Sequence, residues 1–181
     1  MATTSEIKQI RYIVWTALMA ALISCGGIIS IPIGAVPITL QNMFIMLAGL
    51  LLPRRYGISA VLLYLAVGCL GLPVFAGGRS GIATFTGPTG GYLFSFILMT
   101  YITSLKDKLP NPSSFLLVFL LCCLSVIATL VIGTIFLSYI LNISLVKAWI
   151  VGSAPFIIGG FAKAFAATAI YIYFQKYNLL P

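Results

Sequence analysis

Residues 114–141 have the sequence SFLLVFLLCCLSVIATLVIGTIFLSYIL, which contains no charged side chain. An α-helix needs about 20 mostly apolar residues to cross the hydrocarbon core of a bilayer, so this stretch is long enough to span it. Apolar runs with short connections occupy most of the remaining chain, at residues 10–29, 40–53, 57–71, 91–105 and 150–175. The sequence therefore predicts an all-α integral membrane protein, a single membrane domain over residues 1–181 with about six transmembrane helices.

The overall composition agrees with a membrane protein. Hydrophobic residues make up 61% of the chain and charged residues only 7%, whereas a soluble domain carries roughly a quarter charged residues. The acidic residues are Glu6 and Asp107 alone, and there is no histidine. The cysteines lack CxxC spacing and have no histidine to complete a ligand set, so we predict no metal site.

The basic residues occur in short clusters at the ends of the apolar runs, which is typical of topology signals rather than of a nucleic-acid surface. If both termini are cytoplasmic, the inside connections receive most of the positive charge, and only Arg79 and Lys147 lie outside. This bias predicts cytoplasmic N and C termini. The residues predicted on the inside are Lys8, Arg11, Arg54, Arg55, Lys106, Lys108 and Lys176.

An alternative for the first run is a cleaved leader. The sequence LISC at 22–25 is similar to a bacterial lipoprotein cleavage box behind Lys8 and Arg11. Cleavage there would remove the first span and disturb the charge pattern, so the uncleaved reading is preferred.

Two connections rich in glycine and proline, at 30–39 and 71–90, both fall on the predicted outer side. The second, third and fourth runs next to them are short for a straight crossing. Non-helical backbone is tolerated at membrane depth only where protein buries it or where it lines a cavity. These connections therefore predict a pocket near the external face.

Lys163 lies well inside the last apolar run, where a charged side chain is costly and usually functional. No carboxylate is predicted within the membrane to pair with it, because Glu6 and Asp107 both belong to the cytoplasmic side. A substrate carboxylate would satisfy the ammonium by a charge-assisted hydrogen bond. The alternatives are that Lys163 extends to the interface or bonds backbone carbonyls of a broken helix.

Other candidate binding residues lie in or beside the two outer connections. Arg79 offers a fork of donors for a polar ligand, or is an ordinary exposed loop residue. Thr39 and Gln41 contact a ligand or cap the start of the second run. Tyr92 adds a hydroxyl next to the backbone of Gly90 and Gly91.

Apolar and small residues complete the predicted site. Phe75 is a candidate wall for an apolar cavity, although aromatic residues are also common at the membrane interface. Gly159 and Gly160 lie one turn before Lys163, where they allow either a flat ligand or a neighbouring helix to approach closely.

Missing motifs exclude several function classes. The chain has no GxxxxGK[ST] loop for ATP, and without histidine it has no Ser–His–Asp set or HExxH motif. It also lacks a predicted intramembrane acid that would carry protons. We therefore predict a binding protein that is not an enzyme, needs no cofactor and takes its energy from elsewhere.

Three motifs and the last run closely resemble the BioY family, the substrate-binding S components of energy-coupling factor (ECF) biotin transporters. The motifs are VPITLQ at 36–41, FAGG at 75–78 and GPTGGYL at 87–93, followed by Pro155, Phe156 and Lys163 in the last run. The resemblance covers essentially the whole chain. It implies an ECF S-component fold in the bacterial cytoplasmic membrane, with biotin bound at high affinity near the external face.

The resemblance also implies partners, namely a transmembrane T component and two ATP-binding subunits that drive transport. The small residues Ala17 and Ala21 of the first run are similar to the alanine motif that such proteins use to dock on the T component. One position departs from the family pattern, which has an aspartate where this chain has Gly160. The role of that aspartate then falls to a neighbouring hydroxyl, amide or backbone carbonyl, or else its absence weakens binding.

Three rival functions remain at this point. A stand-alone facilitator or secondary carrier would transport without partners. An intramembrane enzyme would need a nucleophile and base that the sequence does not show. A purely structural subunit would have no use for Lys163 at membrane depth.

Overall fold

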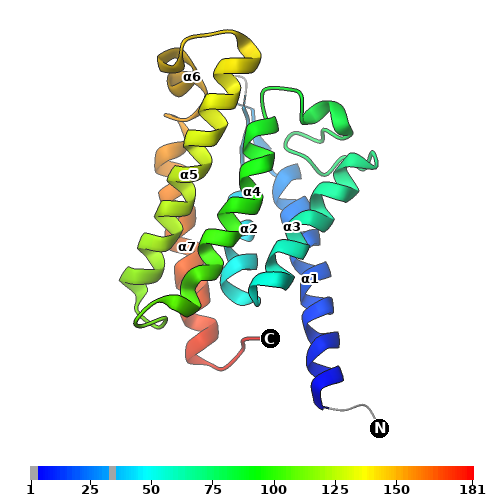
Figure 1. Cartoon of the computed structure of the whole chain (residues 1–181), viewed down its shortest axis with the longest axis vertical. Coiled ribbons are helices and arrows are strands. Elements are labelled where there is room, and N and C mark those ends of the chain that lie inside the picture. The colour runs from blue at the N-terminus through cyan, green and yellow to red at the C-terminus, as the bar shows by residue number, and fades with distance from the viewer. Residues whose placement is uncertain (1–3, 33–35) are drawn as a thin grey trace.

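The apolar runs form a bundle of helices in the computed structural model, which describes residues 4–32 and 36–181 (Figure 1). Part of the predicted outer connection at 30–39, residues 33–35, lies outside the described residues. The helices are α1 (Thr4–Ile28), α2 (Gln41–Leu51), α3 (Arg54–Cys69), α4 (Gly90–Thr103), α5 (Phe115–Leu141), α6 (Leu145–Gly152) and α7 (Phe156–Lys176). Two short 3-10 helices are η1 (Ile82–Thr84) and η2 (Ser104–Lys108), and β1 (Ser30–Ile31) pairs antiparallel with β2 (Ile38–Thr39).

Helix α2 lies at the centre of the bundle, in contact with α1, α3, α4 and α7. It is apolar on every face, as expected of a helix that other helices surround. Ile45, Met46, Ala48 and Leu50 are completely buried. Burial by neighbours explains why this helix is stable with only 11 residues.

Three helices are long and apolar enough to cross a membrane, over Ser5–Ile28, Phe115–Leu141 and Phe156–Lys176. Helix α5 keeps large apolar side chains exposed at intervals of three or four residues, which places them on one face of the helix. Such a stripe is suited to contact with lipid. Its members include Leu116, Leu120, Leu124, Ile127, Val131 and Ile135.

The last apolar region differs from its prediction as a single span over 150–175. The structure has two helices there, α6 and α7, separated by residues 153–155. Pro155 directly precedes α7, and proline is favoured at the start of a helix but not in its interior. Helix α6 also begins earlier than the predicted run, because Ser144 caps it by accepting a hydrogen bond from the Lys147 backbone N–H at 3.4 Å.

The two ends of the molecule differ in composition. Both termini lie toward the end where α4 joins α5, whereas α6 and the glycine-rich connection after α3 lie at the other end (Figure 1). At the end that carries the termini, Arg54 donates to the Ser104 hydroxyl at 3.2 Å, and the Arg54 guanidinium lies 5.0 Å from the centre of the Tyr101 ring. Basic side chains are therefore partly fixed by the fold at the end that carries the termini.

Lys106 in η2 makes the free energy of unfolding depend on pH. It is buried, with Nζ 3.4 Å from Asp107 Oδ1. Burial lowers the pKa of Lys106 below its ordinary value of 10.5, and Asp107 offsets part of this effect. The unfolded chain therefore holds the proton more tightly, and this lysine makes the free energy of unfolding rise as pH increases toward 10.5.

We expect the stability difference between wild type and Lys106→Met to shift in favour of wild type as pH rises from neutrality. Thermal unfolding in detergent at a series of pH values measures this difference. Lys108→Met, which changes an exposed lysine in the same helix, is the matched control. Parallel pH profiles for wild type and Lys106→Met would disprove the effect.

Candidate functional site

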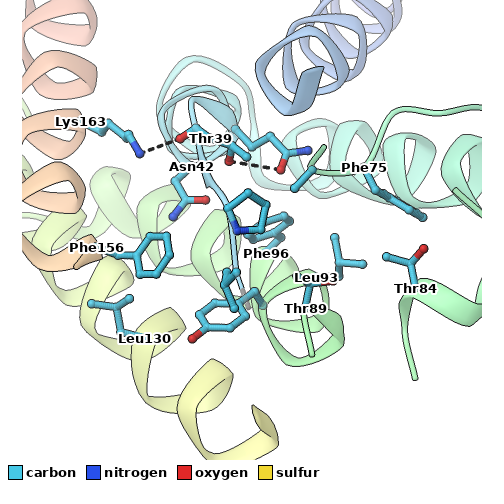
Figure 2. Close-up of a pocket in the computed structure, with 15 residues that line it drawn as sticks. Thr39, Asn42, Phe75, Thr84, Thr89, Leu93, Phe96, Leu130, Phe156 and Lys163 are labelled. Atoms are coloured by element: carbon cyan, nitrogen blue, oxygen red, sulfur yellow. Dashed lines mark hydrogen bonds between the residues drawn. The ribbon is translucent and has the colours of Figure 1, made fainter. Parts of the chain in front are cut away.

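A cavity lies between α2, α4, α5 and α7, and residues just before β2 and in the connection after α3 also line it (Figure 2). Its wall is mostly apolar, with a few polar groups, which is typical of small-molecule sites. The lining residues are Val36, Pro37, Thr39, Gln41, Asn42, Phe75, Ala76, Thr84, Thr89, Tyr92, Leu93, Phe96, Leu130, Phe156 and Lys163.

Lys163 extends from α7 to the cavity, where Nζ donates a hydrogen bond to the backbone carbonyl of Thr39 at 2.6 Å (Figure 2). This bond links α7 to β2 across a sequence separation of 124 residues. The two acids of the chain lie elsewhere, Glu6 in α1 and Asp107 in η2, and neither lines the cavity. The ammonium group thus has a backbone carbonyl as a partner, and its other N–H donors have no second acceptor among the described residues.

Thr39 and Gln41 both line the cavity and are hydrogen-bonded within the fold. The Thr39 hydroxyl donates to Gln41 Oε1 at 3.3 Å. Gln41 Nε2 donates to the Tyr64 hydroxyl at 2.6 Å and to the Val74 carbonyl at 3.5 Å. Gln41 is only 1% exposed, so these bonds fix the start of α2 against α3 and the following connection. Direct contact of either side chain with a ligand stays a prediction.

Tyr92 lines the cavity from the first turn of α4. Its hydroxyl donates to the carbonyl of Gly152, at the break between α6 and α7. The ring lies against α5 at Gly133, where an added Cβ would be 2.2 Å from a Tyr92 ring carbon. Glycine is therefore required at 133 for the ring to lie in this position.

The Tyr92 hydroxyl belongs to a small buried polar network. Ser153 Oγ lies 3.5 Å from it, 2.5 Å from Thr134 Oγ1, and donates to the Leu130 carbonyl at 3.2 Å. These bonds hold one wall of the cavity to the segment where the last two helices separate.

Phe75 lines the cavity with its apolar ring. It is 1% exposed and packs edge-to-face on Tyr64 and Phe85, with ring centres 5.5 and 5.7 Å apart. Edge-to-face contacts of this kind fix the orientation of aromatic rings. The wall that Phe75 provides is consequently rigid.

Several predicted site residues do not line the cavity. Gly90 and Gly91 pack instead against Phe85 and Phe136, where an added Cβ would be 1.9 Å from the Phe85 carbonyl oxygen and 2.4 Å from Phe136 Cβ. Gly160 faces Val126 of α5. These glycines allow the elements around the cavity to pack closely.

Arg79 and the alanine pair also lie outside the cavity. Arg79 lines an adjoining open hollow, which shares Thr84 with the cavity. Ala17 and Ala21 are exposed on α1.

Sequence reasoning missed Asn42, Thr84, Phe96 and Leu130. Asn42 follows Gln41 at the start of an apolar run, and this pair of amides was a usable signal for a polar group at the membrane boundary. Phe96 and Leu130 had no such signal, because each is one apolar residue among many in its helix.

Comparison with known proteins identifies the family. The BioY family model matches residues 1–178. The chain belongs to the BioY family. The resemblance predicted from the sequence motifs is thus confirmed.

BioY relatives match over most of their length. A probable biotin transporter BioY of Pyrococcus horikoshii is 40% identical over 157 residues, which cover 86% of this chain and 90% of the relative. The biotin transporter BioY of Thermotoga maritima is 36% identical over 166 residues, covering 92% and 96%. These names are those of transporters and not of enzymes, in agreement with the prediction.

A solved structure shares the BioY fold. It is the crystal structure of the S component for biotin from an ECF-type ABC transporter, which aligns with a TM-score of 0.86 and 34% identity. The alignment covers 97% of this chain and 95% of that structure. The helical arrangement described above is therefore that of an ECF S component.

Proposed function

We propose that this chain is the high-affinity biotin-binding S component of an ECF-type vitamin uptake transporter in the bacterial cytoplasmic membrane. Membership of the BioY family, the names of its relatives and the fold of the solved biotin S component support this proposal. The cavity supports it as well, since its mostly apolar wall carries a few polar side chains, as small-molecule sites do.

The observation that carries the proposal is the position of Lys163. Its ammonium lies at a mostly apolar cavity without an acidic partner in the wall, which favours a small ligand with an apolar body and strongly polar ends. Biotin has an apolar fused ring and chain between a cyclic urea and a carboxylate. Lys163 or Arg79 neutralises the carboxylate, and side-chain amides, hydroxyls and loop backbone bind the ureido group.

The aromatic side chains of Phe75, Phe96 and Phe156 provide walls for the fused ring. In the proposed topology the chain crosses the membrane six times with both termini in the cytoplasm. The cavity is lined by residues at the starts of α2 and α4, and in this topology it opens toward the external face. The end that carries the termini has the basic connections expected on the cytoplasmic side.

Transport in this proposal requires a T component and two ATP-binding subunits, because the chain has no nucleotide-binding loop of its own. Ala17 and Ala21 lie one turn apart on the exposed face of α1. Small residues at this spacing let a second helix approach closely. This face is the proposed contact with the T component.

Uptake of labelled biotin by cells that lack another biotin transporter tests the whole proposal. We expect uptake only when the chain is produced together with the T component and both ATP-binding subunits. Replacing Ala17 and Ala21 together by leucine is expected to abolish uptake while the purified variant still binds biotin. Ala66→Leu, at an exposed position of α3, is the matched control. Full uptake without partners would instead establish a stand-alone facilitator or carrier.

A further inference from the structure

Most polar side chains of the cavity wall have hydrogen-bond partners within the protein. The groups already engaged belong to Thr39, Gln41, Thr84 and Tyr92. Among the residues that the structure describes, the side chains of Asn42 and Thr89 line the cavity and make no hydrogen bond. A ligand is therefore the natural partner for these two side chains and for the remaining donors of Lys163.

Asn42 and Lys163 line the same cavity and lie on the same side of it in Figure 2. Asn42 is the second residue of α2, and Figure 2 shows its amide beside Lys163 and Thr39, directed at the space next to Phe156. Thr89 lies farther away, on the side of Thr84 (Figure 2). Asn42 is thus the unengaged polar side chain at the Lys163 end of the cavity.

The pair Lys163 and Asn42 offers both donors and an acceptor. A lysine ammonium only donates hydrogen bonds, whereas a side-chain amide has a carbonyl acceptor as well as N–H donors. A cyclic urea is complementary to this pair, because its carbonyl accepts from the ammonium while a ring N–H donates to the amide oxygen. A carboxylate only accepts, so it would leave the Asn42 carbonyl without a donor.

Desolvation favours the same orientation of the ligand. Burying a neutral urea with its hydrogen bonds satisfied costs less than burying a carboxylate. Thr84 is shared by the cavity and by the open hollow that contains Arg79. A ligand with its ring at Lys163 therefore extends its charged end toward an arginine that is still in contact with water.

We propose, on the basis of the proposed function, that Asn42 is a specificity-determining residue for biotin. Its amide oxygen accepts a hydrogen bond from a ring N–H of the ligand, while Lys163 donates to the ring carbonyl. Position 160 supplies no side-chain acceptor, because it is a glycine, and a Cβ added there would lie 2.8 Å from Val126 Cγ1. Among the described residues, no donor of the protein bonds to the Asn42 amide oxygen, so this oxygen is the side-chain acceptor that remains for a ligand at this end of the cavity.

Equilibrium binding to the purified full chain tests this assignment. Asn42→Leu removes the acceptor at similar volume and is expected to weaken binding of biotin and of biotin methyl ester by the same factor, roughly 5- to 100-fold. Asn42→Asp keeps an acceptor and is expected to retain or tighten biotin binding. Biotin methylated on the ring nitrogen that faces Asn42 is expected to bind wild type more weakly than biotin does. Its affinity is expected to fall little further in Asn42→Leu, because the methyl group and the substitution remove the same hydrogen bond.

Asn111→Asp, at an exposed residue distant in sequence from the cavity lining, is the matched control and is expected to bind as wild type does. Two outcomes would overturn the role of Asn42. One is unchanged binding in Asn42→Leu. The other is loss of biotin but not methyl ester binding in Asn42→Asp, which would place the carboxylate at this residue. If Asn42→Leu fails to fold, binding of biotin and its methyl ester to Asn42→Asp, and binding of the methylated ligands to wild type, still test the role of Asn42. Failure of wild type to bind biotin would instead overturn the proposed function.

Discussion

Replacing Lys163 by methionine is expected to weaken biotin binding by roughly 10- to 150-fold, the range for loss of a hydrogen bond from a charged donor. Methionine keeps most of the length and the apolar part of the side chain, so the change mainly removes the ammonium group. The same substitution removes the hydrogen bond to the Thr39 carbonyl, 2.6 Å in length. Titration of the detergent-solubilised variant with labelled biotin measures the effect.

The control for this substitution is Lys147→Met, which changes an exposed lysine of α6. It is expected to leave affinity unchanged. Size-exclusion chromatography establishes that Lys163→Met is folded. If the folded variant bound biotin as tightly as wild type, the ammonium group would not contact the ligand.

Substitution of Gly133 by alanine is the second change with a large expected effect. The new Cβ would be 2.2 Å from a ring carbon of Tyr92, so either the ring or α5 must move. Overpacking of this kind typically costs about 1–3 kcal/mol. Since Tyr92 also forms part of the cavity wall and bonds the Gly152 carbonyl, we expect lower thermal stability together with weaker biotin binding.

Gly159→Ala is the matched control, because an added Cβ there meets no atom within 4 Å. It is expected to keep or slightly raise stability, as alanine favours a helix over glycine by about 1 kcal/mol. The thermal stabilities of the two variants are compared by measuring the fraction of each that stays monodisperse after heating in detergent. Equal thermal stability of Gly133→Ala and Gly159→Ala would show that the contact between Gly133 and Tyr92 is not restrictive.

The sequence was sufficient to locate the helices that carry long apolar runs. Helix α5 matches its predicted range closely, since no charge or proline interrupts it. Pro155 interrupts the last apolar run near its start, but this run was still predicted as a single span, because apolar residues continue on both sides of the break between α6 and α7. Hydrophobicity alone does not distinguish one interrupted span from a short helix followed by a longer one.

The candidate site was less accessible from sequence. Lys163 stood out because a charged residue within a long apolar run is rare, and it does line the cavity. Its partner could not be predicted, because a backbone carbonyl 124 residues away has no sequence signature. The same holds for the hydrogen bonds that engage Gln41 with Tyr64 and Val74, which depend on how α2 and α3 pack.

Equilibrium binding of biotin to the purified chain, without any partner subunit, decides whether this cavity is a biotin site. We expect saturable binding with one site per chain, weakened in Lys163→Met and unaffected in Lys147→Met. Binding to wild type that the Lys163 substitution leaves unchanged would keep biotin as the ligand but move its polar contact elsewhere, with Arg79 the next residue to change. Absence of binding in a sample shown to be folded would contradict the assignment of this cavity to biotin.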